Sequence, residues 1–132
     1  MKNEFVRSAV YLALSLLKVP ARKALAGTGK THRRERSSAE AIATHVVTNL
    51  RRNWEFYRDG KPAKDRDVIQ HLANIIWAVP LEIAQDHAAI DADEREAARQ
   101  FIAEDVFNAL TSEFQPVYAP ERYTGWDNTR IR

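Results

Sequence analysis

Cationic side chains are most concentrated in a basic segment, residues 18–36, where they could bind phosphate groups. It holds seven Lys or Arg residues and one acid, Glu35, for a local net charge of +6. Cations on a mobile loop can reach successive phosphates of a nucleic acid and release its condensed counterions without reading bases. The segment therefore predicts binding to an RNA or DNA backbone, and its candidate contacts are Arg22, Lys23, Lys30, Arg33, Arg34 and Arg36. The alternative is a solvated basic loop that has no ligand.

A second group of cations lies farther along the chain, among aromatic residues. Arginines interleaved with aromatic rings are typical of surfaces that bind single-stranded nucleic acid. Trp54 and Tyr57 continue an apolar helical stripe from Leu50, which favours core packing for both, whereas Phe56 lies off the stripe and is the better candidate for base stacking. The cations that we add to the candidate interface are Arg51, Arg52, Arg58, Lys61 and Lys64.

The string from Gly27 to Thr31 contains the Gly-Lys-Thr ending of a phosphate-binding P-loop. That motif needs a glycine five residues before Gly29, where this chain has Ala24. It also needs a preceding strand, where the sequence predicts a helix. We therefore do not assign nucleotide binding to this string.

Residues that could support catalysis are few and scattered. Glu82 and Asp86 share a face of a predicted helix, and with His87 they could hold Mg²⁺ or Mn²⁺ in a helical nucleotide hydrolase. Such hydrolases pair two helices with repeated acidic motifs, and only one such pair occurs here; the other possible ligands are His71, Asp91 and Asp93. We therefore predict a non-catalytic protein with no cofactor and no bound metal, and keep the metal-dependent hydrolase as a third hypothesis.

The elements that must position these residues are predicted to be helices. Apolar residues recur at three- and four-residue intervals, the period of one helix face. Pro20 is expected to close the first helix, Gly27 to stop a short second one, and Pro80 to kink or divide the fourth. The predicted helices cover residues 3–19, 20–26, 37–57, 65–84 and 91–114.

Two helix starts carry a recognisable capping pattern. Ser37 with Glu40, and Asp91 with Glu94, have the capping-box spacing. No stretch alternates apolar and polar residues over enough positions to support a sheet. The predicted fold class is therefore all-α: a single-domain four- or five-helix bundle over residues 1–115, with a basic loop at 27–37. Residues 116–132 are predicted to form an irregular tail with aromatic and basic side chains.

Charge is distributed unevenly along the 132 residues. Residues 1–66 hold 15 Lys or Arg against 6 Asp or Glu, a net +9, while residues 67–132 hold 5 against 12, a net −7, so the whole chain carries only +2. This asymmetry favours an anionic partner for the first half, head-to-tail self-association of unlike halves, or both.

The sequence predicts neither a membrane protein nor a secreted one. The apolar run over residues 10–17 follows Lys2 and Arg7, as in a signal peptide, but it is too short to span a bilayer and no small-residue cleavage site follows it. We interpret this run as a buried helix. Because the chain has no cysteine, it forms no disulfide, and we expect it in the cytoplasm.

The chain resembles the small subunits of multi-subunit CRISPR effector complexes. The resemblance rests on the basic segments Arg22-Lys23 and Lys30 to Arg36, on the stretch Arg51 to Trp54, and on the overall size. The resemblance implies a non-catalytic subunit of an antiviral ribonucleoprotein that stacks head to tail along an RNA-bound filament. Such a subunit would contact other protein subunits and guide the guide–target duplex or the displaced strand. The alternative is a phage-type inhibitor or adaptor that binds a protein through the acidic helix at 91–114.

Overall fold

The computed structural model of the chain describes residues 2–120, which form six helices and one small sheet. The elements, in chain order, are α1 (Lys2–Ser15), α2 (Val19–Ala26), α3 (Arg36–Leu50), β1 (Trp54–Arg58), β2 (Lys61–Pro62), α4 (Asp65–Trp77), α5 (Leu81–His87), α6 (Ala92–Glu113) and β3 (Gln115–Tyr118). Most of the predicted helical fold is therefore confirmed, with a sheet added.

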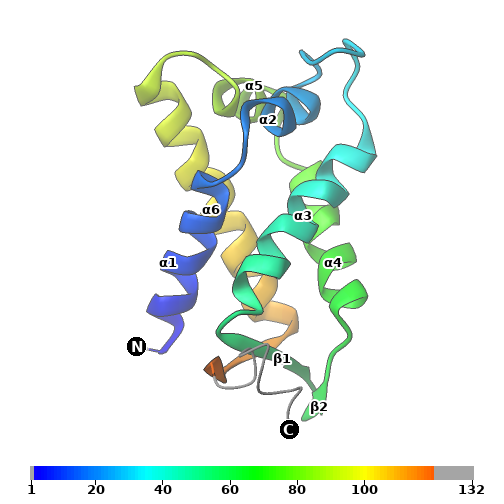
Figure 1. The fold of residues 1–132 in the computed structure, drawn as a ribbon, viewed down its shortest axis with the longest axis vertical. Coiled ribbons are helices and arrows are strands. Elements are labelled where there is room, and N and C mark those ends of the chain that lie inside the picture. The colour runs from blue at the N-terminus through cyan, green and yellow to red at the C-terminus, as the bar shows by residue number, and fades with distance from the viewer. Residues whose placement is uncertain (1, 121–132) are drawn as a thin grey trace, which may run out of the picture.

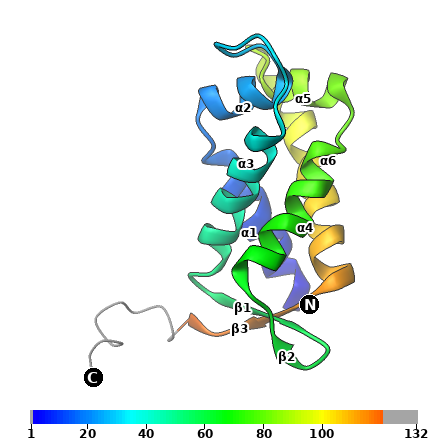
Figure 2. The ribbon, with the colours of Figure 1, turned by 90° about the vertical axis from the view of Figure 1, so that its right-hand side faces the viewer.

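The long helices α1, α3, α4 and α6 run along the long axis of the molecule (Figure 1). The short helices α2 and α5 lie across one end, beside the loop over residues 27–35, and we call this the α2–α5 end. The three strands lie at the other end, which we call the sheet end (Figure 2). The bundle thus separates the first group of predicted cations from the second by its full length.

A single core holds the helices together. The longest helix, α6, packs against α1, α4 and α5, while α3 packs against α1 and α4. Burying one large aliphatic side chain contributes about 2 kcal/mol, so the fully buried residues supply most of the stabilisation. They include Val10, Leu14, Ile42, Val46, Leu72, Ile76, Ile102 and Leu110.

Three of the predicted helix boundaries are confirmed, whereas the predicted end of the first helix at Pro20 is wrong, because α1 ends at Ser15 and Pro20 lies in the first turn of α2. Gly27 ends α2 in the left-handed conformation (φ +80°), and the N–H of Thr28 donates to the Lys23 carbonyl at 2.9 Å. Pro80 separates α4 from α5. Asp91 caps α6, because its Oδ2 accepts a hydrogen bond from the N–H of Glu94 at 3.1 Å.

The capping box predicted at Ser37 is wrong. Helix α3 begins at Arg36, and Glu35 takes the N-cap position without a side-chain hydrogen bond to the helix. The hydroxyl of Ser38 donates instead to the backbone carbonyl of Glu35. The first turn of α3 is therefore left without a side-chain cap.

The predicted helix over 37–57 is wrong beyond Leu50, and so is the predicted absence of a sheet. Strand β1 pairs antiparallel with β2 on one side and with β3 on the other. Asp59 and Gly60 both have positive φ, of 54° and 78°, as a two-residue hairpin turn requires. Trp54 and Phe56 point into the core while alternate residues do not, so the period is two and not 3.6.

Two further predictions are wrong because of the sheet. Phe56, the predicted stacking residue, is only 3% exposed and cannot meet a base. Residues 116–118, predicted as irregular, belong to β3 and pair with β1. Of the rest of the predicted tail, residues 121–132 lie outside the described residues.

The left-handed conformation at Gly27 gives the first testable prediction. Replacing Gly27 with Ala forces a side chain into this conformation, with a Cβ 3.2 Å from the backbone nitrogen of Arg34. We expect Gly27→Ala to lower the free energy of unfolding by about 1–2 kcal/mol in urea denaturation. In the matched control Gly29→Ala, the Cβ would be 3.5 Å from the nearest atom, an ordinary contact, so the loss should be much smaller. Equal losses would contradict the assignment.

Candidate nucleic-acid interface

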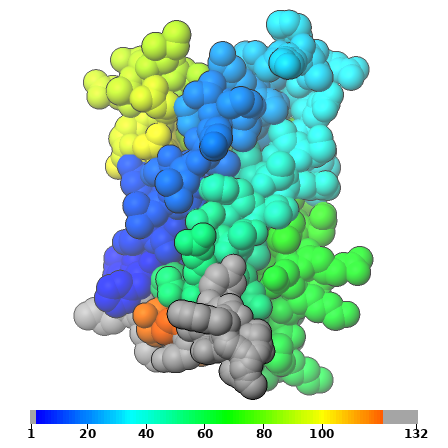
Figure 3. Space-filling model, in the orientation of Figure 1, coloured from blue at the N-terminus to red at the C-terminus, as the bar shows by residue number. Residues whose placement is uncertain are grey.

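A groove of about 770 Å³ lies at the α2–α5 end, between α2, the loop over residues 27–35 and the start of α3. We call it the basic groove. Three cations line it, Lys23 from α2 and Lys30 and Arg33 from the loop. Figure 3 shows α2 and the loop as neighbours on one face of the molecule. The hydroxyl residues along the groove are Thr28, Thr31, Ser37 and Ser38.

The acid in the basic groove is Glu35, which lies 3.5 Å from the Arg33 guanidinium. The Arg33 side chain is 77% exposed and that of Glu35 is 42% exposed. An ion pair this open to water stabilises little, at most about 1 kcal/mol, so an incoming phosphate can replace Glu35 as the partner of Arg33.

Arg34 fixes the loop that forms one wall of the basic groove. Its Nε donates to the carbonyl of Leu25 at 2.9 Å, and its Nη2 donates to those of Trp77 and Val79 at 3.3 and 3.1 Å. The guanidinium also lies 4.7 Å above the Trp77 ring. Arg34 thus points into the protein, where it joins the end of α2 to the junction between α4 and α5.

The other predicted cations of the basic segment also bind protein atoms. Arg22 donates from Nη1 to the Leu17 carbonyl at 2.7 Å, at the end of α1. Arg36 donates to the side chain of Asn74 and lies 3.7 Å from Glu40. The structure therefore brings Lys23, Lys30 and Arg33 together at the groove and holds Arg22, Arg34 and Arg36 elsewhere.

The second predicted group of cations lies at the sheet end. Arg51 pairs with Asp65 at 3.1 Å, and Arg58 lies 3.8 Å from Glu113 and stacks 4.6 Å above the ring of Phe114. The three remaining cations of this group are exposed at the end of α3 and around the β1–β2 hairpin, and they are Arg52, Lys61 and Lys64. The structure does not bring this group into contact with the basic groove (Figure 2).

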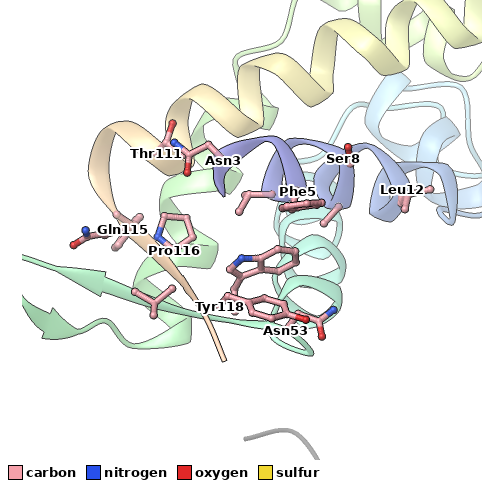
Figure 4. A pocket seen from close by; sticks show the side chains of 14 residues that line it. Asn3, Phe5, Ser8, Leu12, Asn53, Thr111, Gln115, Pro116 and Tyr118 are labelled. Carbon is pink, nitrogen blue, oxygen red and sulfur yellow. The ribbon is translucent and has the colours of Figure 1, made fainter. Parts of the chain in front are cut away.

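A second groove, of about 1030 Å³, opens at the sheet end between α1, the end of α6 and strand β3 (Figure 4). None of the 14 described residues that line it is charged. Trp54 and Tyr118 meet there edge to face, with ring centroids 5.8 Å apart. This apolar groove offers no charge to a phosphate, so the basic groove is the better candidate of the two for a nucleic-acid backbone.

The structure also shows a polar cluster around the buried His87 that the sequence did not reveal. Its members come from α1, α2, α5 and α6 and are far apart in the chain: Tyr11, Arg22, His87, Arg95, Glu96 and Arg99. Burial, together with repulsion by Arg22, Arg99 and Arg95, lowers the pKa of His87 to about 4. A hydrogen bond from the Tyr11 hydroxyl lowers the pKa of Glu96.

These surroundings do not suit the metal site considered from the sequence. His87 lies near three guanidinium groups, which repel a cation. Within residues 2–120, no three His, Asp or Glu side chains group closely enough to hold a metal ion. The same part of the chain contains no helix that is long and apolar enough to cross a membrane.

No known family model, curated protein or solved structure matches this chain.

The three carbonyl contacts of Arg34 predict a structural role. Arg34→Lys keeps the charge but loses the planar fork that reaches all three carbonyls, so the free energy of unfolding should fall by about 1–3 kcal/mol. The matched control is Arg33→Lys, because Arg33 is exposed and should change stability by less than about 0.5 kcal/mol. Urea denaturation of both variants measures the difference, and a stable Arg34→Lys protein would refute the role.

The buried His87 predicts a dependence of stability on pH. Its pKa is about 4 in the folded protein against 6.5 ordinarily, so the unfolded chain takes up the proton first as the pH falls. The contribution of His87 should be complete above pH 6.5 and fall by about 3 kcal/mol as the pH drops from 6.5 to 4.

Denaturation at a series of pH values, with His87→Gln beside the wild type, measures this contribution. The variant should lose stability less steeply between pH 6.5 and 4, because it has no ring to protonate. His32→Gln, at an exposed loop position, should follow the wild type. Parallel curves for the wild type and His87→Gln would contradict the prediction.

Proposed function

We propose that the protein binds the phosphate backbone of a nucleic acid through the basic groove, without catalysing a reaction. The observation that carries this proposal is the convergence of Lys23, Lys30 and Arg33, from a helix and a loop, on one groove. Only one acid, Glu35, lies among its lining residues, and that acid is weakly held. A polyanion therefore meets three cations that have little competing charge.

The start of α3 adds hydrogen-bond donors to the same groove. The free N–H groups of a helix's first turn and the helix dipole favour an anion at that end. In α3 this turn has no side-chain cap, and Ser37 lies along the groove. Thr28 and Thr31 supply further hydroxyls from the loop. These groups suit phosphate oxygens better than they suit an apolar ligand.

The basic groove suits the backbone of a nucleic acid and not its bases. No aromatic residue is among the described residues that line it, so it offers no surface on which a base could stack. Three phosphate contacts give only weak binding that depends little on sequence. This supports a role inside a larger assembly, where other subunits add contacts to the same strand.

We propose further that this assembly is a ribonucleoprotein, as the resemblance to CRISPR small subunits implies. The basic loop and the acidic start of α6 lie at the same end of the molecule on opposite sides (Figure 1). Successive copies could therefore place a basic side against an acidic one, along a strand bound in successive grooves.

The alternative function, an inhibitor or adaptor that binds a protein through the acidic helix α6, has less support. Three acids of this helix already have partners within the chain. Glu96 accepts from Tyr11 and Arg99, Glu104 pairs with Arg7, and Glu113 lies 3.8 Å from Arg58. Fewer acidic groups are then left to imitate a phosphate backbone.

Salt dependence tests the proposed groove. The triple variant Lys23→Gln, Lys30→Gln, Arg33→Gln should bind single-stranded RNA or DNA less tightly, and the slope of log affinity against log salt should fall by about two units. Fluorescence anisotropy of labelled strands across a salt series gives both quantities.

A matched control distinguishes binding at the basic groove from binding driven by the net charge of the protein. The variant Arg52→Gln, Lys61→Gln, Lys64→Gln removes the same three charges at the sheet end, and we expect it to keep the wild-type slope. Equal effects of the two triple variants would show that net charge, and not the groove, drives binding. A wild-type chain that binds neither RNA nor DNA at low salt would overturn the proposal.

A further inference from the structure

Several side-chain nitrogens of the polar cluster around His87, at the α2–α5 end, lack hydrogen-bond partners. Among residues 2–120, four buried side-chain nitrogens have none, and all four belong to this cluster: Nε of Arg22, Nε of Arg99, and Nδ1 and Nε2 of His87. Buried polar groups without partners are rare in folded proteins and indicate that a further partner binds there. Their concentration in one cluster points to a single shared partner.

Positive charge is in excess in this cluster. Arg22, Arg95 and Arg99 come close enough for Arg95 and Arg99 to lower the pKa of Arg22, after the larger effect of burial. The acid of the cluster, Glu96, already accepts hydrogen bonds from Tyr11, Arg99 and Gln100. It cannot also neutralise the guanidiniums of Arg22 and Arg95, which are half-buried, and charges withdrawn from water are ordinarily paired.

Backbone carbonyls at helix ends hold two of these arginines in place. Nη1 of Arg22 donates to Leu17 at the end of α1, and Nη1 of Arg95 donates to Ala89 and Ile90 just beyond α5, at 3.1 and 2.9 Å. The carbonyls satisfy part of each guanidinium and restrict its orientation. They do not supply the negative charge that the cluster lacks.

We propose that this cluster binds a small inorganic oxyanion of the size of phosphate or sulfate, held by the Nε–H groups of Arg22 and Arg99 and by the ring of His87. Such an ion brings several acceptor oxygens and the missing charge. A water molecule would bring acceptors without charge, and a metal ion would be repelled.

The enclosure of the cluster favours a free ion over a phosphate of a nucleic acid. His87 is only 1% exposed, and the two unpartnered Nε atoms are inaccessible to solvent. A polymer cannot reach these atoms without opening the helices around His87. The site is separate from the basic groove, although Arg22 and Lys23 are neighbours on α2, because Lys23 lines the groove and Arg22 turns into the cluster.

Calorimetric titration of the full chain with inorganic phosphate, and then with sulfate, tests the site, with chloride at matched ionic strength as the reference. We expect a saturable site, and a melting temperature that rises with phosphate but not with chloride. Arg22→Gln and Arg99→Gln should each weaken phosphate binding about tenfold or more, since each removes a charged hydrogen bond. Arg52→Gln removes the same charge at an exposed position of the sheet end, away from both proposed anion sites, and should bind phosphate as the wild type does.

Two further measurements distinguish a loss of phosphate binding from a loss of folding in a less stable variant. Circular dichroism shows whether each variant is folded, and nitrogen NMR of the wild-type His87 ring should shift on addition of phosphate. The inference is overturned if chloride and phosphate have equal effects, or if Arg22→Gln and Arg99→Gln leave phosphate binding intact. Either result would mean an adventitious ion only. Loss of phosphate binding in Lys23→Gln, or its displacement by an oligonucleotide, would place the ion in the basic groove and equally overturn the inference.

Discussion

The contact between the Arg34 guanidinium and three backbone carbonyls determines the shape of the α2–α5 end. It joins Leu25 in α2 to Trp77 and Val79 at the junction of α4 and α5, and it sets the path of the loop between α2 and α3. A cation at helix C-terminal carbonyls is favourable because those carbonyls carry partial negative charge. The basic groove exists because this loop is held over α2.

The cations of this end fall into two groups: those that bind backbone carbonyls of the protein and those that remain available to a partner. Arg22 and Arg95 bind carbonyls at the ends of α1 and α5, as Arg34 does for α2. Lys23, Lys30 and Arg33 remain on the groove side. The two proposed anion sites follow from this division: an open groove suited to a chain of phosphates, and an enclosed cluster suited to a single small ion.

Local sequence signals were enough to predict the helix boundaries at Gly27, Pro80 and Asp91, because each depends on the conformation or capping ability of one residue. The strand over Trp54–Arg58 was missed because its apolar residues also fit a helical stripe, although the Asp59-Gly60 turn signalled a hairpin. The sequence identified the basic segment, but only tertiary contacts show which cations are occupied. His87 and its arginines could not be grouped beforehand, because three helices, α2, α5 and α6, bring them together.

The central claim is that the basic groove binds a nucleic-acid backbone. A two-dimensional amide NMR titration of the folded chain with a short single-stranded oligonucleotide tests it most directly, because each residue reports separately. The account predicts salt-sensitive shifts concentrated in residues 23–37, with little change around the hairpin at 54–62. Shifts centred on the sheet end, or no shifts at low salt, would contradict it.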